Sequence, residues 1–274
     1  MMAFLKRYNK DWSFPRLKEI ADQIEYEALD SNVIGRVDIT NTFVGSELNT
    51  EYLFGMFATF GESSNTSLIG VPLNQTVVEL IAQGNTISTS IIVTFNWTVA
   101  LIPLQFNTMF MFNDQGKVIQ YDSQLLRSSR ILPTILPALV PHLAKELNLP
   151  LDTDPIHLVS LRAAYDICAT HEQYCTDSLR QYNSTDECMD FILNQVVFGD
   201  IDLAGQNTGI CRYLHHAMVA RRPEIHCSHI GPTGGDMCFD KPYAEETIDS
   251  PFQKSFVQLP GGLTLGEAFA LVDD

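Results

Sequence analysis

The chain has 274 residues, of which 45% are hydrophobic and 18% are charged, and its formal net charge is −16. This is the composition of a globular protein long enough to bury a core, and it argues against disorder. Because so acidic a surface repels phosphate backbones, we expect no nucleic-acid partner. The sequence lacks an uninterrupted apolar run of about 18 residues, so we expect no membrane span, and residues 1–7 contain no secretory apolar core.

The first predicted element is a helix over residues 13–29. Ser13 is suited to cap its N-terminus and Pro15 to its first turn, and apolar residues recur at helical spacing after them. We expect Gly35 to end the following turn. The β-branched residues over 37–44 then predict a short strand.

A run of strands joined by short turns is the clearest pattern in the sequence. The strands are rich in β-branched and aromatic residues, and the turns contain Gly84-Asn85 and Asn113-Asp114-Gln115-Gly116. The predicted strand ranges are 76–82, 86–101, 105–112 and 117–126. Such an antiparallel meander must bury its apolar side, so we expect a helix to cover one face.

The second half is predicted to be mainly helical. The helical stretches cover about 131–148, 155–170, 184–197 and 207–221, with a possible short helix at 265–272. Residues 226–238 are too rich in glycine and proline to be helix or strand throughout.

All six cysteines lie in this second half. They are Cys168, Cys175, Cys188, Cys211, Cys227 and Cys238. An even number within so short a stretch is typical of a disulfide framework and of an oxidising compartment. Four Asn-x-Ser/Thr sequons, at Asn65, Asn74, Asn96 and Asn183, point the same way. A location in the endoplasmic reticulum or outside the cell therefore competes with a cytoplasmic one, and the sequence leaves both open.

A zinc site is the alternative use of this region. The imidazoles and thiols near one another in sequence belong to His215, His216, His226, Cys227, His229 and Cys238. They do not form paired Cys-x-x-Cys motifs, and three disulfides would use every cysteine, so we predict disulfides and no metal. We also expect no cofactor, because no Gly-x-Gly-x-x-Gly motif is present, and no serine nucleophile, because Gly-x-Ser-x-Gly is missing.

The hairpin Phe110-Met-Phe-Asn-Asp-Gln-Gly-Lys-Val-Ile-Gln-Tyr121, together with the helix and long strands before it, resembles the SnoaL-like branch of the NTF2-like superfamily. The resemblance covers residues 13–127 and implies an α+β fold. In this fold a curved antiparallel sheet wraps as a cone around an N-terminal helix and encloses an apolar pocket. Residues 128–274 depart from the family and are expected to form a helical, disulfide-linked extension that packs on the pocket domain. Many such proteins dimerise through the outer sheet face, so the resemblance also allows a homodimer.

A narrower resemblance comes from Cys211-Arg-Tyr-Leu-His-His216 and from residues 226–238. These segments resemble the epoxide hydrolases of fungal polyene-pyran mycotoxin pathways, of the aurovertin and citreoviridin type. The resemblance implies a cofactor-free epoxide hydrolase or cyclase that acts on a polyene polyketide in secondary metabolism. Two other interpretations remain: a SnoaL-like isomerase, dehydratase or cyclase, and a secreted, disulfide-rich binding module without catalysis.

Epoxide opening needs a base that activates water and an acid that protonates the leaving oxygen. Two carboxyls in different environments can take these two parts. The resemblance implies a catalytic carboxylate at Asp122, and Asp38, between two apolar residues, is the second candidate. Glu79 and Tyr26 are further catalytic candidates. Each has a purely structural alternative: a solvated strand face, a turn, or a packed ring.

The predicted substrate-binding residues lie on the same elements. Gln120 shares the strand face of Asp122, because side chains alternate along a strand. If Asn96 faced solvent as a glycosylation site, Phe95 and Trp97 would face the pocket and suit a long unsaturated ligand. Tyr52 is a candidate hydrogen-bond donor to an epoxide or carbonyl oxygen.

Overall fold

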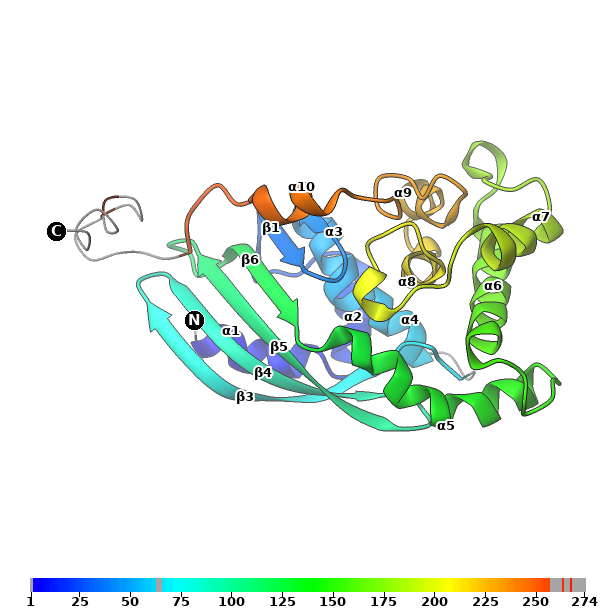
Figure 1. The fold of residues 1–274 in the computed structure, drawn as a ribbon. Helices are drawn as coiled ribbons and strands as arrows, with labels where there is room; N and C mark the ends of the chain where they lie inside the picture. The colour runs from blue at the N-terminus through cyan, green and yellow to red at the C-terminus, as the bar shows by residue number, and fades with distance from the viewer. Residues whose placement is uncertain (1, 63–65, 257–262, 264–266, 268–274) are drawn as a thin grey trace.

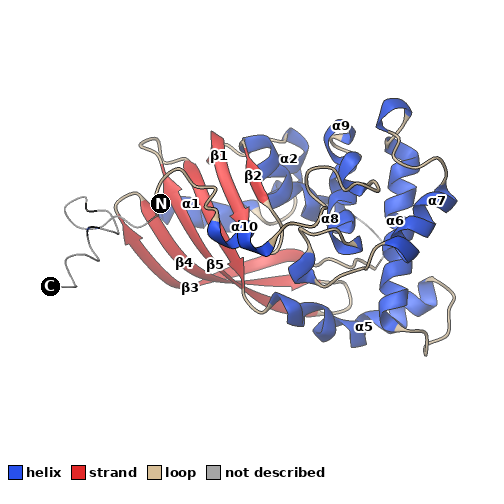
Figure 2. Ribbon diagram, turned by 45° about the horizontal axis from the view of Figure 1, so that its top comes forward, coloured by secondary structure: helices blue, strands red, loops and turns tan. Residues whose placement is uncertain are grey.

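The computed structural model describes residues 2–62, 66–256, 263 and 267. It confirms the expected α+β architecture, with a curved, mainly antiparallel sheet at one end of the molecule and the helices of residues 131–226 at the other (Figures 1 and 2). The six strands are β1 Leu29–Val37, β2 Thr42–Val44, β3 Val71–Gln83, β4 Thr86–Asn96, β5 Leu101–Phe112 and β6 Val118–Leu125. Their order in the sheet is β2-β1-β6-β5-β4-β3, and only the β1–β6 pair is parallel.

The predicted meander is present as β3 to β6. Its turns form where expected, because Gly84 and Gly116 take positive φ angles of 56° and 76° that glycine adopts without strain. The predicted strand over 86–101 is divided, however. Trp97 N–H donates to Ala100 O at 2.9 Å and closes a turn, after which β5 starts at Leu101 and runs through Pro103.

The N-terminal helical region differs from the prediction. Two helices, α1 Met2–Asp11 and α2 Arg16–Gln23, replace the single helix expected over 13–29. Ser13 does not cap α2; its hydroxyl donates to Lys10 O at 2.7 Å, at the end of α1. The following residues enter β1 from Leu29, and Gly35 lies within this strand instead of ending a turn. A Cβ atom at Gly35 would lie 2.2 Å from the ring of Tyr121, so glycine lets that ring pack against the strand.

A further helical run links β2 to β3. It consists of α3 Ser46–Thr50, a π-helical turn Glu51–Gly55 and α4 Met56–Glu62. A π-helical turn accommodates one more residue per hydrogen-bonded ring than an α-helix, and such turns are frequent at functional sites. This turn carries Glu51 and Tyr52, both of which are buried.

The second half is helical, as predicted. Its helices are α5 Ile131–Glu146, α6 Pro155–Tyr174, α7 Thr185–Asp190, α8 Gly209–Val219, α9 Pro223–His226 and α10 Tyr243–Ile248. A π-helical turn, Phe191–Gln195, follows α7 within the stretch predicted as one helix. The short helix predicted over 265–272 falls almost wholly outside the described residues. Among the helices of the described chain, none is both long and apolar enough to cross a membrane.

Three disulfides form, as predicted from the even number of cysteines. They join Cys168 to Cys188, Cys175 to Cys227 and Cys211 to Cys238. One hydrophobic cluster also extends from the sheet into these helices, since it contains Phe95 and Trp97 of the sheet region together with Leu139, Ile167 and Tyr213. The extension is therefore packed on the sheet through a continuous core as well as cross-linked within itself.

A buried histidine in this extension predicts a pH-dependent stability. His171 Nε2 accepts hydrogen bonds from the backbone N–H groups of Gln181, at 2.9 Å, and Tyr182, at 3.3 Å, so only the neutral ring fits. Burial, and to a lesser extent Arg180, lowers the pKa of His171 below its ordinary value, against the opposing charges of Glu172 and Glu187.

Since the unfolded ring titrates at about pH 6.5, the neutral ring stabilises the fold fully above that pH. This contribution is expected to be lost as the pH falls through the lower pKa of the folded state. Urea unfolding of the wild type and of His171→Gln at pH 7 and at pH 5 checks this. We expect the variant to lose less stability between the two pH values than the wild type loses. Equal losses would contradict the assignment.

Candidate functional site

A cavity of about 170 Å³ lies between the concave face of the sheet and the helices. Its walls are largely aromatic, and the rings belong to Phe4, Tyr8, Trp12, Tyr26, Phe43, Tyr52, Phe57, Phe95, Trp97, Phe106, Phe110 and Tyr121. Ile201, Ala204 and Leu214 of the extension complete the lining. This central cavity is suited to a small, apolar, unsaturated molecule, and both halves of the chain build it.

Four of the residues predicted for the site do line the central cavity. Phe95 and Trp97 face it from the end of β4 and the turn after it, each with only 3% of its surface exposed, as the strand alternation around Asn96 predicted. Tyr26 and Tyr52 line it as well. Trp97 is held in place by a hydrogen bond from Nε1 to Leu68 O, at 3.1 Å.

Asp122 and Gln120 lie on the opposite face of the sheet. Tyr121 and Ser123 of β6 face the cavity, so the alternating residues between and beside them point away. Asp122 binds Arg36 through both carboxylate oxygens, at 2.9 and 2.6 Å. Of the two orientations that the sequence left open for Asp122, the structure has the one that points away from the cavity.

The segment after α10 covers this outer face. In Figure 1, α10 lies beside β1 and β6, on the side of the sheet away from α1. The Phe252 ring lies 5.2 Å from the Arg36 guanidinium, and Gln120 donates to Lys254 O at 2.7 Å. Because of this cover, Asp122 is buried without facing the cavity.

The two remaining carboxyl candidates do not reach the cavity lining either. Asp38 follows β1, and its Oδ1 accepts a hydrogen bond from Leu125 N–H at 3.0 Å, which anchors the end of β6. Burial raises the pKa of Asp38 above its ordinary value. Glu79 is exposed on β3. The structure thus does not bring Asp122, Asp38 and Glu79 together at one reacting group.

Four of the polar side chains that line the cavity are phenols, those of Tyr8, Tyr26, Tyr52 and Tyr121. Tyr26 donates to Asp11 Oδ2 at 2.9 Å, and burial raises the pKa of both Tyr26 and Tyr121. The Tyr121 hydroxyl, Trp12 Nε1 and the side-chain oxygen of Gln75 are buried without a hydrogen-bond partner in the described part of the chain. A bound ligand with hydroxyl or carbonyl groups would satisfy them.

Behind Tyr52 lies a group that the sequence did not reveal as a unit. His215 of α8, His226 of α9 and His229 of the following turn converge, each at most 2% exposed; we call them the histidine cluster. His229 Nδ1 lies 3.0 Å from His215 Nδ1 and 3.3 Å from His226 Nδ1. The Tyr52 hydroxyl lies 2.9 Å from Nε2 and 3.1 Å from Nδ1 of His215, and so joins the cluster to the cavity wall.

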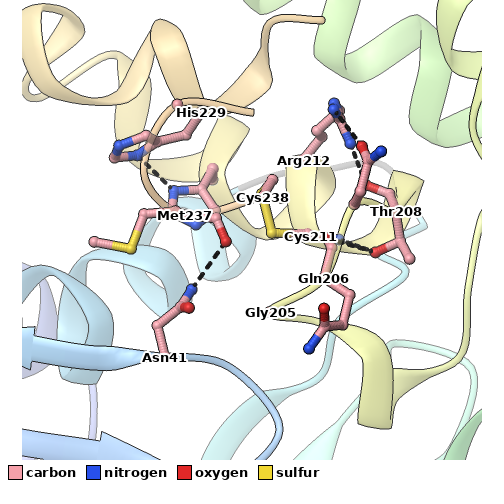
Figure 3. The surroundings of a disulfide bond; sticks show 12 residues. Asn41, Gly205, Gln206, Thr208, Cys211, Arg212, His229, Met237 and Cys238 are labelled. Carbon is pink, nitrogen blue, oxygen red and sulfur yellow. Dashed lines mark hydrogen bonds between the residues drawn. A yellow bond between two sulfur atoms is a disulfide. The ribbon is translucent and has the colours of Figure 1, made fainter. Parts of the chain in front are cut away.

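The histidine cluster is flanked by carboxylates. His229 Nε2 lies 2.7 Å from Asp236 Oδ1, and His226 Nε2 lies 3.2 Å from Oε1 of the fully buried Glu51. The other oxygen of Glu51 binds Arg222 at 3.1 Å. Figure 3 shows His229 near the Cys211–Cys238 disulfide, which joins α8 to the segment that carries His229 and Met237.

Burial sets the protonation of His215, His229 and Tyr52. It lowers the pKa of His215 well below its ordinary value, with His229 and His226 adding to the effect, and it lowers the pKa of His229 to about 4. Burial likewise raises the pKa of Tyr52 well above its ordinary value, with Glu51 contributing. At neutral pH the resting state therefore has a protonated phenol beside neutral imidazoles.

Comparison with protein families gives two adjacent matches. Residues 6–123 match the BfoA N-terminal domain, and residues 127–241 match the BfoA family C-terminal domain. Among curated proteins, the chain is 39% identical over 248 residues to "Aurasperone B biosynthesis cluster protein A" of Aspergillus niger, covering 89% of this chain and 79% of the relative. It is 40% identical over 248 residues to "Bifonsecin B biosynthesis cluster protein A" of Aspergillus brasiliensis, covering 89% and 81%.

Solved structures with similarity include an LEH-like epoxide hydrolase of M. tuberculosis, with 10% identity over 53% of this chain and 92% of that one, and a TM-score of 0.37. A protein described as a SnoaL-like polyketide cyclase from Jannaschia sp. matches at 12% identity over 50% and 89%, with a TM-score of 0.36.

Proposed function

The chain belongs to the BfoA family across both of its domains, and from this membership we propose that it is an enzyme of fungal polyketide metabolism that holds its substrate in the central cavity. Tyr52 would act there as the proton donor. The relatives are named for biosynthesis clusters, which supports a role in secondary metabolism. The observation that carries the proposal is the position of Tyr52, on the cavity wall and in hydrogen-bond contact with His215.

The arrangement lets Tyr52 act as a proton donor, with a hydrogen bond from His215 offsetting the weak acidity of the buried phenol. Its raised pKa keeps the phenol protonated at neutral pH, and the Nε2 atom of neutral His215 can donate a hydrogen bond to the phenol oxygen. That donation leaves the phenol proton free to point at a substrate oxygen. As the proton moves to the substrate, the hydrogen bond from His215 stabilises the phenolate that forms.

Epoxide opening is the reaction we place first. The Tyr52 proton would pass to the epoxide oxygen as the carbon–oxygen bond breaks. Water would add to the carbon, and the surplus proton of that water would return to the phenolate. Ring closure or dehydration of a polyketide would use the same proton transfers, so the product decides between them. In this assignment Tyr52 replaces the pair of Asp122 and Asp38, since neither carboxylate lines the cavity.

The experiment is to incubate the purified protein with polyketides extracted from a culture whose copy of the gene is deleted. Mass spectrometry of the mixture is expected to show one compound consumed. Gain of one water indicates hydrolysis, loss of one water indicates dehydration, and an unchanged mass indicates cyclisation or isomerisation.

A binding protein without catalysis is the second candidate, because the cavity lining is almost wholly apolar and includes none of the candidate carboxylates. If a compound co-purifies with the protein but is never altered, the binding function replaces the catalytic one.

A further inference from the structure

The histidine cluster has no place in the proton transfer beyond His215, and its geometry points to a separate property. We propose that His215, His226 and His229 form a binding site for a divalent transition-metal ion such as zinc. The ion would share His215 with the proposed proton transfer, but the test of ion binding does not depend on turnover.

The distances between the ring nitrogens fit one ion. The ligand atoms of the three residues all lie within 4.8 Å of one another, and two of the Nδ1–Nδ1 distances are 3.0 and 3.3 Å. Zinc binds imidazole nitrogen at about 2.0–2.1 Å in tetrahedral geometry, which separates two ligand nitrogens by about 3.3 Å. Only small movements would therefore bring one nitrogen of each histidine onto a single ion.

The surroundings favour Nδ1 as the ligand atom of His229 and His226, whereas the Tyr52 hydroxyl lies near both nitrogens of His215. His229 Nε2 faces Asp236 at 2.7 Å, and His226 Nε2 lies 3.2 Å from Glu51. His215 Nε2 faces the Tyr52 hydroxyl at 2.9 Å. Histidines that bind metals almost always donate their other N–H to a carboxylate, carbonyl or water, which fixes the tautomer and the ring orientation.

This set of tautomers leaves no proton or cation between the Nδ1 atoms of the histidine cluster. If each Nε2 carries the proton, the Nδ1 lone pair of His229 faces those of His215 and His226 at 3.0 and 3.3 Å, and a cation would relieve their repulsion. His226 Nε2 and Glu51 Oε1 are also buried without a hydrogen bond in the described residues, because their contact is poorly aligned. The carboxylates of Glu51 and Asp236 supply negative charge for a dication, one of them shared with Arg222.

The disulfide explains why cysteine is not a ligand here. Cys211 and Cys238 also lie within reach of His215, but their sulfur atoms are bonded to each other. The bond instead fixes α8, with His215, to the loop that follows His226 and His229 (Figure 3). It thereby holds the three imidazoles in place before any ion binds.

The test uses the full-length protein without a histidine tag, freed of metal with a chelator and dialysed. Titration with Zn²⁺ in a calorimeter is expected to show one ion bound per chain. Co²⁺ is expected to give the visible absorption bands of four-coordinate cobalt with nitrogen ligands. His229→Ala should abolish both signals, whereas His157→Ala, which removes an exposed histidine outside the cluster, should change neither.

A second variant covers the case in which His229→Ala does not fold. The Asp236 side chain is 81% exposed, so Asp236→Asn should leave the fold intact. Loss of a partner of this kind is expected to weaken Zn²⁺ binding about 10–100-fold. If the wild type binds no Zn²⁺, or if His229→Ala or Asp236→Asn binds it as tightly as the wild type, the proposal is overturned and the cluster is a hydrogen-bonded network.

Discussion

Tyr52→Phe is expected to lower kcat by about 10²–10⁴-fold, the range typical for removal of a general acid or base. Phenylalanine keeps the ring, which stacks on Phe43 with 3.7 Å between ring centroids, so the cavity should retain its shape. Only the hydroxyl near His215 is lost. The loss should therefore fall on kcat, while KM for an apolar substrate changes little.

The matched control is Asp122→Asn. Asp122 lies on the outer face of the sheet, where its carboxylate binds Arg36 and does not line the cavity. We expect this variant to keep its turnover and to lose about 1–3 kcal/mol of stability, because the charged hydrogen bonds to Arg36 weaken. Turnover on the culture extract and urea unfolding measure the two effects. The opposite result, an active Tyr52→Phe and a folded but inactive Asp122→Asn, would restore the carboxylate mechanism that the sequence suggested.

Local patterns explain how much of this fold could be predicted from the sequence. The hairpin around Gly116 and the helices of the second half follow from turn residues and apolar spacing, which act within a few residues. That every cysteine forms a disulfide followed from the even number of cysteines. The division of the first helix did not, because Ser13 serves the end of α1 instead of starting α2.

The site depended on information that local patterns do not contain. The sequence left the orientation of Asp122 open, because nothing near it in sequence shows that Phe252 and Lys254 cover the outer face of the sheet. Tyr52 and His215 are 163 residues apart. His226 and His229 were recognised in the sequence as metal-binding residue types. Because they were considered together with the cysteines, the histidine cluster, which contains no cysteine, was not identified. When every cysteine is assigned to a disulfide, the histidines remain as the candidate ligands of that region. That remainder is the signal that would have identified the histidine cluster from the sequence.

Removing the Cys175–Cys227 disulfide is expected to be the most damaging change to the stability of the extension. It closes a loop of 52 residues, against 20 residues for Cys168–Cys188. Loop-closure entropy then assigns about 4 kcal/mol to the first bond and about 3 kcal/mol to the second. Each bond is removed by replacing both of its cysteines with alanine, and stability is measured by urea unfolding.

The two variants should differ in stability by more than the difference between these entropic estimates, because the native surroundings of the two bonds differ. Cys227 directly follows His226 and lies two residues before His229, so its bond to the end of α6 also fixes the histidine cluster. Cys168–Cys188 joins α6 to α7 within the extension. We therefore expect the Cys175→Ala/Cys227→Ala variant to lose both stability and Zn²⁺ affinity, and the Cys168→Ala/Cys188→Ala variant to lose stability alone. Equal Zn²⁺ affinity in both variants would mean that the Cys211–Cys238 bond is sufficient to hold the three imidazoles together.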